Sequence, residues 1–317
     1  MVCAHGVRSN TEGTEVRSLK ESIGFSSELA SIYAESIRVI SEICRSRFGL
    51  TYSQFVVMKI LSSAEEGLRA GDLACAVGLK IGSLWLLLLD LEDKGLIVKE
   101  SEEDDRRVMR CSLSVEGASV IAECNSEVLD TLVKRYWVAL PDREFFEYAR
   151  PTIDDNLARL KGESADSAGV PHSPSDVLTA SFLVFLRVLT ERWTEACRLH
   201  QLTLAEARLL VRLADGETRP SDVSEDLFMT KSLVTRLKAR MSEQGLIHEK
   251  ENPDNGQSVL LTLTPSGARA AQEVLVELDR VTRNALVFDR GAAMATLNAW
   301  HTRIYLNMRA ERSFRRK

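Results

Sequence analysis

Seven polar and basic side chains are concentrated in one short stretch of this 317-residue sequence. They are Thr230, Lys231, Ser232, Thr235, Arg236, Lys238 and Arg240, and no acidic residue follows them before Glu243. Lysine and arginine pair with phosphates and with guanine O6 and N7, and hydroxyl groups can serve either phosphates or bases. We therefore expect this stretch to bind DNA, with Lys231 and Arg236 as the best candidates for base edges. The alternative is a basic face that only contacts solvent.

The residues around this stretch predict two helices followed by a β-hairpin. A short helix begins near Pro220, and after a turn a second helix runs from Thr230 to Gln244 and ends at Gly245. Its buried stripe is expected to be Leu233, Leu237 and Met241. Residues 246–249 can pair with an alternating strand over 259–263. This is the order of a winged helix-turn-helix, whose second helix enters the major groove of DNA.

The same pattern occurs about 150 residues earlier in the chain. Lys94-Gly95-Leu96-Ile97 matches Gln244-Gly245-Leu246-Ile247, and Gly117 matches Gly267. Both copies open on a capping box, which is Thr51-x-x-Gln54 in the first and Thr203-x-x-Glu206 in the second. Repeated caps, glycines and strands indicate two copies of one domain.

Each copy resembles the MarR (multiple antibiotic resistance regulator) family. The first carries L-T-Y-S-Q, L-E-D-K-G-L-I, D-D-R-R and S-L-S-V-E-G, and the second carries L-T-L-A-E, M-T-K-S-L-V-T-R-L, E-Q-G-L-I and L-T-L-T-P-S-G. The resemblance covers about residues 25–160 and 175–312. It implies a homodimer-like arrangement in which the first and last helices of two domains intertwine and the two winged helices face adjacent major grooves.

We expect a mainly α fold with small β-hairpin wings, in which two MarR-like winged helix-turn-helix domains on one chain form an intramolecular pseudo-dimer. The expected divisions are a flexible N-terminal arm at 1–24, a first domain at 25–161, a linker at 162–174 and a second domain at 175–317. The linker prediction rests on composition, since that segment is rich in serine, glycine and proline.

The first copy departs from the resemblance in its second helix. Apolar or acidic residues replace the basic ones, with Leu86 for Arg236, Leu88 for Lys238 and Asp90 for Arg240. These positions are expected to face DNA, but leucine cannot bind phosphate and aspartate repels it. An apolar patch of this kind usually marks an interface, either within the protein or with a protein partner or second chain. The patch consists of Ile81, Trp85, Leu86 and Leu89.

The wings show the opposite distribution of charge. The first copy has Arg106 and Arg107 at its wing tip and Arg110 in the following strand, whereas the second has Asp254-Asn255-Gly256-Gln257. The resemblance implies that a wing arginine reaches the minor groove. The two tip arginines could instead form surface ion pairs with neighbouring acids. The first copy thus keeps a basic wing, and the second keeps a basic helix.

Composition limits the remaining possibilities. The net charge is −5, which argues mildly against a nonspecific nucleic-acid coater but leaves a local DNA-binding surface open. No apolar run is long enough to span a membrane, and the N-terminus lacks the apolar core of a signal peptide, so we expect a cytoplasmic protein. Six unpaired cysteines and five isolated histidines predict reduced thiols, no metal site and no cofactor.

Two functions remain open. The first is a DNA-binding transcription regulator, a repressor that responds to a small aromatic effector, as the resemblance implies. Because the two copies differ, its operator is expected to be asymmetric. The second is a protein-interaction module or anti-regulator with weak or no DNA binding. The sequence contains no recognisable catalytic motif, so we do not expect an enzyme.

Overall fold

The protein is described by a computed structural model over residues 21–101, 108–136, 143–162, 178–253, 256, 258–288 and 291–314. Within these residues it is mainly helical with small antiparallel sheets, as expected. Among them no single helix is both long and apolar enough to cross a membrane. Only the bent pair α3 and α4 meets the length and composition criteria together.

The first half (residues 21–162) contains the expected helix-turn-helix and hairpin. The helix-turn-helix and hairpin follow in the predicted order, whereas strands β1 and β2 were not predicted. The elements of this half are β1 (Glu21–Ser22), α1 (Ser27–Phe48), α2 (Tyr52–Leu61), β2 (Leu68–Arg69), α3 (Ala70–Val77), α4 (Ile81–Asp93), β3 (Ile97–Ser101), β4 (Met109–Leu113), α5 (Val115–Arg135) and α6 (Arg143–Lys161).

The second half (residues 178–314) has the same order of helices. Its hairpin lacks a counterpart of β2, and the single bridge between Thr218 and Leu261 stands in its place. The elements are α7 (Ala180–Leu199), α8 (Leu204–Ala214), α9 (Pro220–Asp226), α10 (Lys231–Glu243), β5 (Ile247–Glu251), β6 (Val259–Leu263), α11 (Pro265–Ala285), β7 (Val287–Phe288) and α12 (Gly291–Phe314).

Both predicted capping boxes are present. Thr51 caps α2 and exchanges hydrogen bonds with Gln54, and Thr203 does the same with Glu206 at the start of α8. These contacts satisfy backbone N–H groups that a helix start otherwise leaves unpaired. The two helices therefore begin at equivalent positions, which sets the start of each helix-turn-helix.

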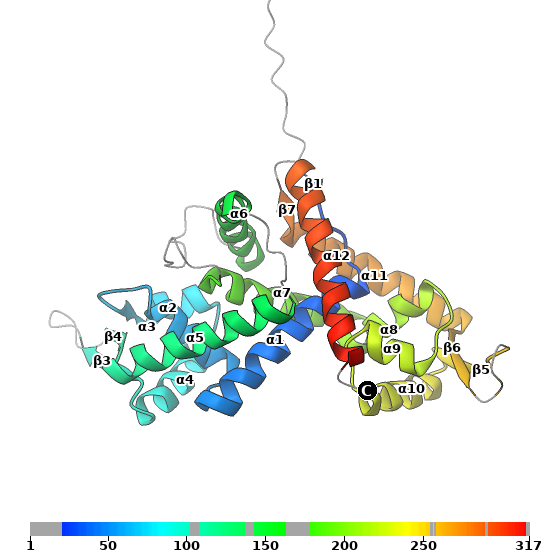
Figure 1. The fold of residues 1–317 in the computed structure, drawn as a ribbon, viewed down its shortest axis with the longest axis horizontal. Helices are drawn as coiled ribbons and strands as arrows, with labels where there is room; N and C mark the ends of the chain where they lie inside the picture. The colour runs from blue at the N-terminus through cyan, green and yellow to red at the C-terminus, as the bar shows by residue number, and fades with distance from the viewer. Residues whose placement is uncertain are drawn as a thin grey trace, which may run out of the picture.

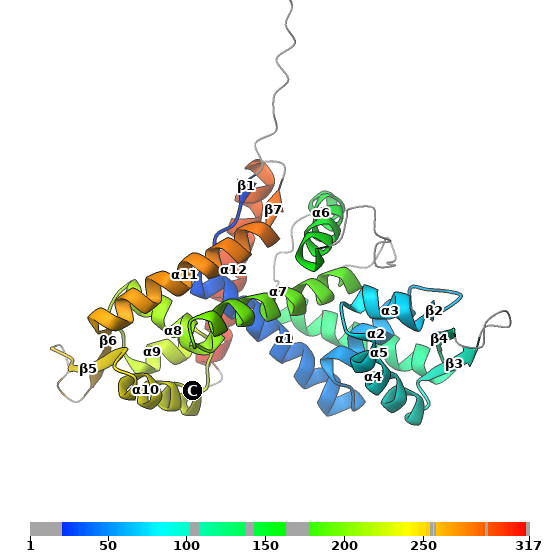
Figure 2. The same cartoon turned by 180° about the vertical axis from the view of Figure 1, so that it is seen from behind.

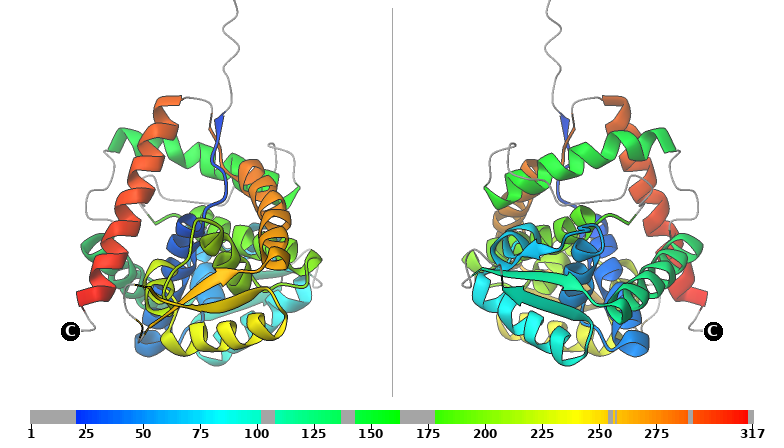
Figure 3. Two further views of the ribbon diagram at one scale, coloured as in Figure 1. Left: turned by 90° about the vertical axis from the view of Figure 1, so that its right-hand side faces the viewer. Right: turned by 90° about the vertical axis from the view of Figure 1, so that its left-hand side faces the viewer.

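Two groups of elements lie at opposite ends of the molecule, with α1 and α7 between them (Figure 1). We call α2 to β4 (residues 52–113) the first head and α8 to β6 (residues 204–263) the second head. Helices α4 and α10 both lie along the lower edge in Figures 1 and 2. In the end views of Figure 3, α6 crosses the opposite side of the molecule.

The last helix of each half packs against the first helix of the other half. Helix α6 contacts α7 and α11, and α12 contacts α1 and α5. The short strand β1 also pairs antiparallel with β7, which joins the start of the described chain to the end of α11. This pairing was not predicted, and it gives residues 21–22 of the expected arm a defined structure.

The buried core runs continuously through both halves. Trp193 of α7 is fully buried, and its ring stacks on Tyr33 of α1 with ring centroids 5.8 Å apart. Its indole N–H donates to Thr282 Oγ1 of α11 at 2.9 Å, so the one polar atom of this large side chain is satisfied. On α1, Val39 and Cys44 are buried, while Ile37 and Ile43 are only partly covered.

Candidate nucleic-acid interface

Helix α10 presents the basic face that the sequence predicted. Thr230 is its N-cap and accepts a hydrogen bond from the Leu233 backbone N–H at 3.2 Å. Val234, Leu237 and Met241 are buried beneath the helix, whereas Leu233 is only partly buried. The predicted stripe therefore omitted Val234, while Leu233 is partly buried and packs against the core.

The opposite face of α10 is exposed. Lys231, Ser232, Thr235, Arg236 and Arg240 all lie on the surface. The Thr235 hydroxyl donates to the Lys231 carbonyl oxygen at 3.0 Å, which leaves its lone pairs outward, and the Thr230 and Ser232 hydroxyls lie 3.1 Å apart. Within the described residues, Lys231 and Arg236 make no ion pair. Their charges are therefore available to a ligand such as phosphate.

The other two cations of α10 already have carboxylate partners. Lys238 Nζ lies 3.0 Å from Glu249 of β5, and Arg240 Nε lies 3.0 Å from Glu206 of α8, a side chain that is fully buried. A buried carboxylate requires a nearby cation or hydrogen-bond donors to offset its lost hydration. Arg240 thus has a structural role in the second head.

The turn that precedes α10 is held by side chains from three helices. Phe228 has a φ of +53°, a left-handed conformation that is uncommon for a bulky residue and costs free energy. Arg208 of α8 donates to the Leu227 carbonyl oxygen, and Arg312 of α12 and Ser224 of α9 donate to the Met229 carbonyl oxygen at 3.0 and 2.8 Å. These contacts fix the direction in which α10 leaves the turn.

A buried charged cluster connects the same turn to α1. Arg208 donates to Ser31 Oγ of α1 at 2.7 Å, and burial lowers the pKa of its guanidinium to about 10. Glu35 of α1 is also buried and lies 3.4 Å from Arg312 Nη1. Sequence reasoning missed both Arg208 and Arg312, because a buried arginine at a helical position looks the same in sequence as an exposed one.

Helix α4 occupies the equivalent place in the first head but carries no cation on its outer face. Ile81 and Leu89 are each 48% exposed, Leu86 is 71% exposed, and Trp85 is partly buried under the Lys99 ammonium group. The predicted patch is therefore not covered within the described chain. Leu88, which we expected to face DNA, is instead fully buried with Leu84 and Leu91. Where the second head has Lys238, the first head therefore has a leucine that belongs to the core.

The wing residues of the first head fall into two groups. Arg106 and Arg107 lie outside the described residues. Arg110 is on β4, and its guanidinium donates to the carbonyl oxygens of Glu66 and Gly67 at 3.4 and 3.2 Å. Arg110 therefore ties the loop before β2 to the sheet.

The turn before α4 also has basic partners that the sequence did not reveal. Arg187 of α7 donates to the Val77 and Gly78 carbonyl oxygens, and Lys161 of α6 donates to Cys75 and Ala76 at 2.7 and 3.3 Å. In both heads, cations from other helices thus hold the turn that begins the second helix.

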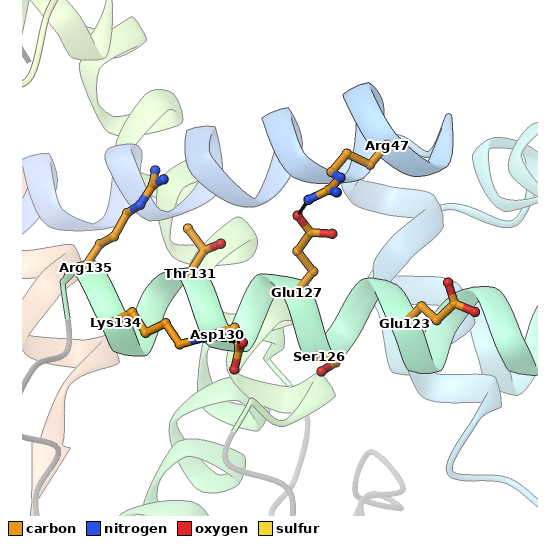
Figure 4. Close-up of a pocket in the computed structure, with 8 residues that line it drawn as sticks. All are labelled: Arg47, Glu123, Ser126, Glu127, Asp130, Thr131, Lys134 and Arg135. Carbon is orange, nitrogen blue, oxygen red and sulfur yellow. Dashed lines mark hydrogen bonds and ion pairs between the residues drawn. The ribbon is translucent and has the colours of Figure 1, made fainter.

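Two open cavities lie near these elements. A space of about 250 Å³ between α1, α12 and the α9–α10 turn is lined by Glu35, Arg38, Tyr136, Phe228, Thr230, Glu311 and Arg312. A groove of about 520 Å³ runs between α1 and α5 (Figure 4). In this groove Arg47 pairs with Glu127, and Lys134 pairs with Asp130 at 2.6 Å, which is typical of a solvated helix surface.

The five cysteines among the described residues form no disulfide, and all but Cys75 are buried. Cys44 and Cys124 lie 3.6 Å apart between α1 and α5. The contact with Cys124, with burial, raises the pKa of the Cys44 thiol. A thiol held neutral in this way is a poor nucleophile. The described residues contain no group of three or more potential ligands that could hold a metal ion.

Part of the chain is similar to a known protein family. The MarR family matches residues 50–109. An uncharacterized HTH-type transcriptional regulator, YhjH of Bacillus subtilis (strain 168), is 26% identical over 113 residues. The match covers 32% of this chain and 65% of that relative, so the chain spans slightly less than two thirds of the relative's length.

Solved structures of regulators are also similar. The transcriptional regulator BldR from Sulfolobus solfataricus is 26% identical with a TM-score of 0.35, over 39% of this chain and 88% of that one. CouR from Rhodococcus jostii RHA1, solved with p-coumaroyl-CoA, is 20% identical with a TM-score of 0.36, over 43% of this chain and 90% of that one. The match at residues 50–109 coincides with the helix-turn-helix and hairpin of the first head. Residues 50–109 are a MarR-family winged-helix domain.

Proposed function

We propose that the protein is a DNA-binding transcription regulator, a repressor, in which two non-equivalent winged helices act as an intramolecular pseudo-dimer. The observation that carries the proposal is the outer face of α10, where Lys231 and Arg236 are exposed without acidic partners. An arginine or lysine on the second helix of this motif is placed to reach guanine in the major groove.

The arrangement of helices supports a pseudo-dimer. The final helix of each half crosses to the first helix of the other, and both second helices lie on one side of the molecule (Figures 1 and 2). We propose the domain limits 25–161 and 175–317 for the two winged-helix domains, joined by a linker at 162–174 and preceded by an arm at 1–24. Two heads on one face can contact successive major grooves, so that repression follows from blocking polymerase access.

Because the heads differ in surface chemistry, we propose an operator with one strongly read half-site. The second head would supply Arg236 and Lys231 for bases, with Thr230, Ser232, Thr235, Lys238 and Arg240 near phosphates. The first head would supply only wing contacts from Arg106, Arg107 and Arg110, which bind phosphate or the minor groove without reading many bases.

Selection from a pool of random duplexes at moderate salt tests the proposal. We expect enrichment of a motif with one strong and one weak half. Arg236→Ala should weaken binding by about 1–3 kcal/mol and relax one position in the strong half, whereas Leu86→Ala at the equivalent position of α4 should change neither. Weak binding that depends on salt without any enriched motif would reject a sequence-specific regulator. Equal effects of the two substitutions would reject α10 as the reading helix.

We also propose that a small aromatic acid acts as effector in the cavity beside the α9–α10 turn. The rings of Tyr136 and Phe228 line this cavity together with the guanidinium groups of Arg38 and Arg312. A carboxylate that binds Arg312 would compete with the Met229 carbonyl oxygen and so loosen the turn before α10. Titration with benzoate should lower operator affinity in the full chain and not in Phe228→Ala. An unchanged affinity with benzoate and related aromatic acids would reject the effector site.

The alternative function is a protein-interaction module with weak or no DNA binding. The exposed patch at Ile81, Trp85, Leu86 and Leu89 favours it, because such a surface attracts apolar partners. The duplex selection separates the two functions, since an interaction module would enrich no motif.

A further inference from the structure

The outer face of α4 has the pattern of a helix that packs against another helix. Ile81, Trp85 and Leu89 form one row at spacings of four residues, and Gly82 and Leu86 form the adjacent row. Leu86 is the most exposed of these side chains, and within the described residues Ile81 and Leu89 are also exposed, whereas Trp85 is partly covered by Lys99 of β3. Large aliphatic side chains that cluster on a surface usually mark a binding interface.

This face is complementary to itself when two copies run antiparallel. In a pair centred between Trp85 and Leu86, Gly82 of one helix lies opposite Leu89 of the other, and Trp85 lies opposite Leu86. A Cβ placed on Gly82 would meet no atom within 4 Å, so the surface above it is open. A leucine side chain from a second helix can occupy that space and approach the backbone closely.

The charges at the ends of α4 also favour the antiparallel direction. Lys80 precedes the first turn, which contains no acid, and the last residues include Asp90, Glu92 and Asp93. Lys94 pairs with Asp90, and Lys99 pairs with Glu92, whereas Asp93 makes no ion pair within the described residues. An antiparallel pair brings each Lys80 toward the partner's acidic end and opposes the two helix dipoles. A parallel pair would place like charges together.

We propose that α4 is a self-association surface whose occupant is the α4 helix of a second copy of this chain, packed antiparallel across a two-fold axis. Such an isologous contact closes at two copies. Stable interfaces bury roughly 1,200–2,000 Å² in total. One pair of four-turn helices buries less, so the dimer is weak and its population rises with protein concentration. Helix α10 lies at the other end of the molecule (Figure 1), so the contact does not use its basic face.

Sedimentation velocity of the full chain over a range of concentrations tests the pairing. We expect a sedimentation coefficient that rises with concentration toward a dimer. Leu86→Glu should weaken the association at least tenfold, because it places two carboxylates at the centre of the contact. Val276→Glu is the matched control, since Val276 of α11 is 61% exposed and lies outside the patch. A monomer at all concentrations, or equal weakening by both variants, would overturn the proposal.

A charge exchange tests the direction of the helices. Lys80→Glu alone should weaken the dimer, because it places an acid near the acidic end of the other helix. Lys80→Glu combined with Asp93→Lys should restore the dimer, because the introduced acid of one copy then lies near the introduced lysine of the other. Lack of recovery in the double variant would reject the antiparallel arrangement. If the wild type is monomeric and Leu86→Glu instead abolishes duplex binding, the patch is a DNA-contact surface and self-association is rejected.

Discussion

Helices α4 and α10 have equivalent buried residues but exposed faces of opposite chemistry, one apolar and the other basic. Leu84 and Leu91 in α4 occupy the same positions as Val234 and Met241 in α10, and all four are buried. At an exposed position the two helices differ completely, with Leu86 in one and Arg236 in the other. Packing restricts the buried positions, whereas the outer positions change with little effect on the fold. Function therefore has to be inferred from the outer face of each helix separately.

Helices α4 and α10 also differ in how each contacts the first helix of its own head. In the first head, Asp90 of α4 accepts a hydrogen bond from Gln54 of α2. In the second head, Arg240 pairs with Glu206 at the equivalent positions. The same contact between the capping-box residue and the second helix is thus made with different chemistry. Because both heads make a contact at this position with different residue pairs, we infer that the contact is structural.

The largest predicted effect tests what the two heads share. A Cβ on Gly117 or Gly267 would lie 1.9 or 1.8 Å from the carbonyl oxygen of Leu96 or Leu246, and both glycines stand in the first turn of the helix after the wing. Gly117→Ala and Gly267→Ala should each lower the free energy of unfolding by about 3 kcal/mol or more, because backbone must move. Denaturant unfolding measures this. A loss below about 1 kcal/mol in either variant would show that the two junctions are not equivalent.

Much of the local structure that the two heads share could be predicted from the sequence. The capping boxes and the end of α10 before Gly245 are local signals, and the structure confirms each of them. The pairing of β1 with β7 could not be predicted, because two-residue strands leave no periodic pattern. The exposed cations of α10 were found by type and spacing. The arginines that hold its preceding turn were not, because their role depends on distant segments meeting in the fold.

We predict that Arg312 of α12 positions α10 through the turn that precedes this helix. Arg312→Gln removes the guanidinium that contacts Met229 O, Glu35 and the Phe228 ring, whose centroid lies 5.7 Å from Arg312 Cζ. We expect operator affinity to fall about tenfold, or about 1.4 kcal/mol, with the sequence preference unchanged, since Arg312 does not face the duplex. Arg303→Gln on the same helix removes an equal charge from an exposed site and is the control. Equal losses in the two variants would mean that only net charge matters.

A smaller effect distinguishes the two inter-helix contacts. Arg240→Ala leaves the buried Glu206 carboxylate with the Thr203 backbone and hydroxyl donors alone, each at 2.8 Å. We expect a loss of about 1–2 kcal/mol in the free energy of unfolding. Asp90→Ala in the first head should cost less than about 1 kcal/mol, because Gln54 is neutral. Thermal unfolding of the two variants compares them directly, and a larger loss for Asp90→Ala would contradict this account of Glu206.

The smallest effect separates the free cations of α10 from the paired ones. Each phosphate contact contributes about one unit to the slope of log affinity against log salt concentration. Lys231→Ala should lower that slope by about one, because Lys231 has no acidic partner in the described chain. Lys238→Ala should lower it by less, since Lys238 has Glu249 at 3.0 Å and binding phosphate would require breaking this pair. Lys80→Ala in the first head should leave the slope unchanged if α4 does not meet the duplex. A reduction at Lys80 equal to that at Lys231 would place both heads on DNA through their second helices.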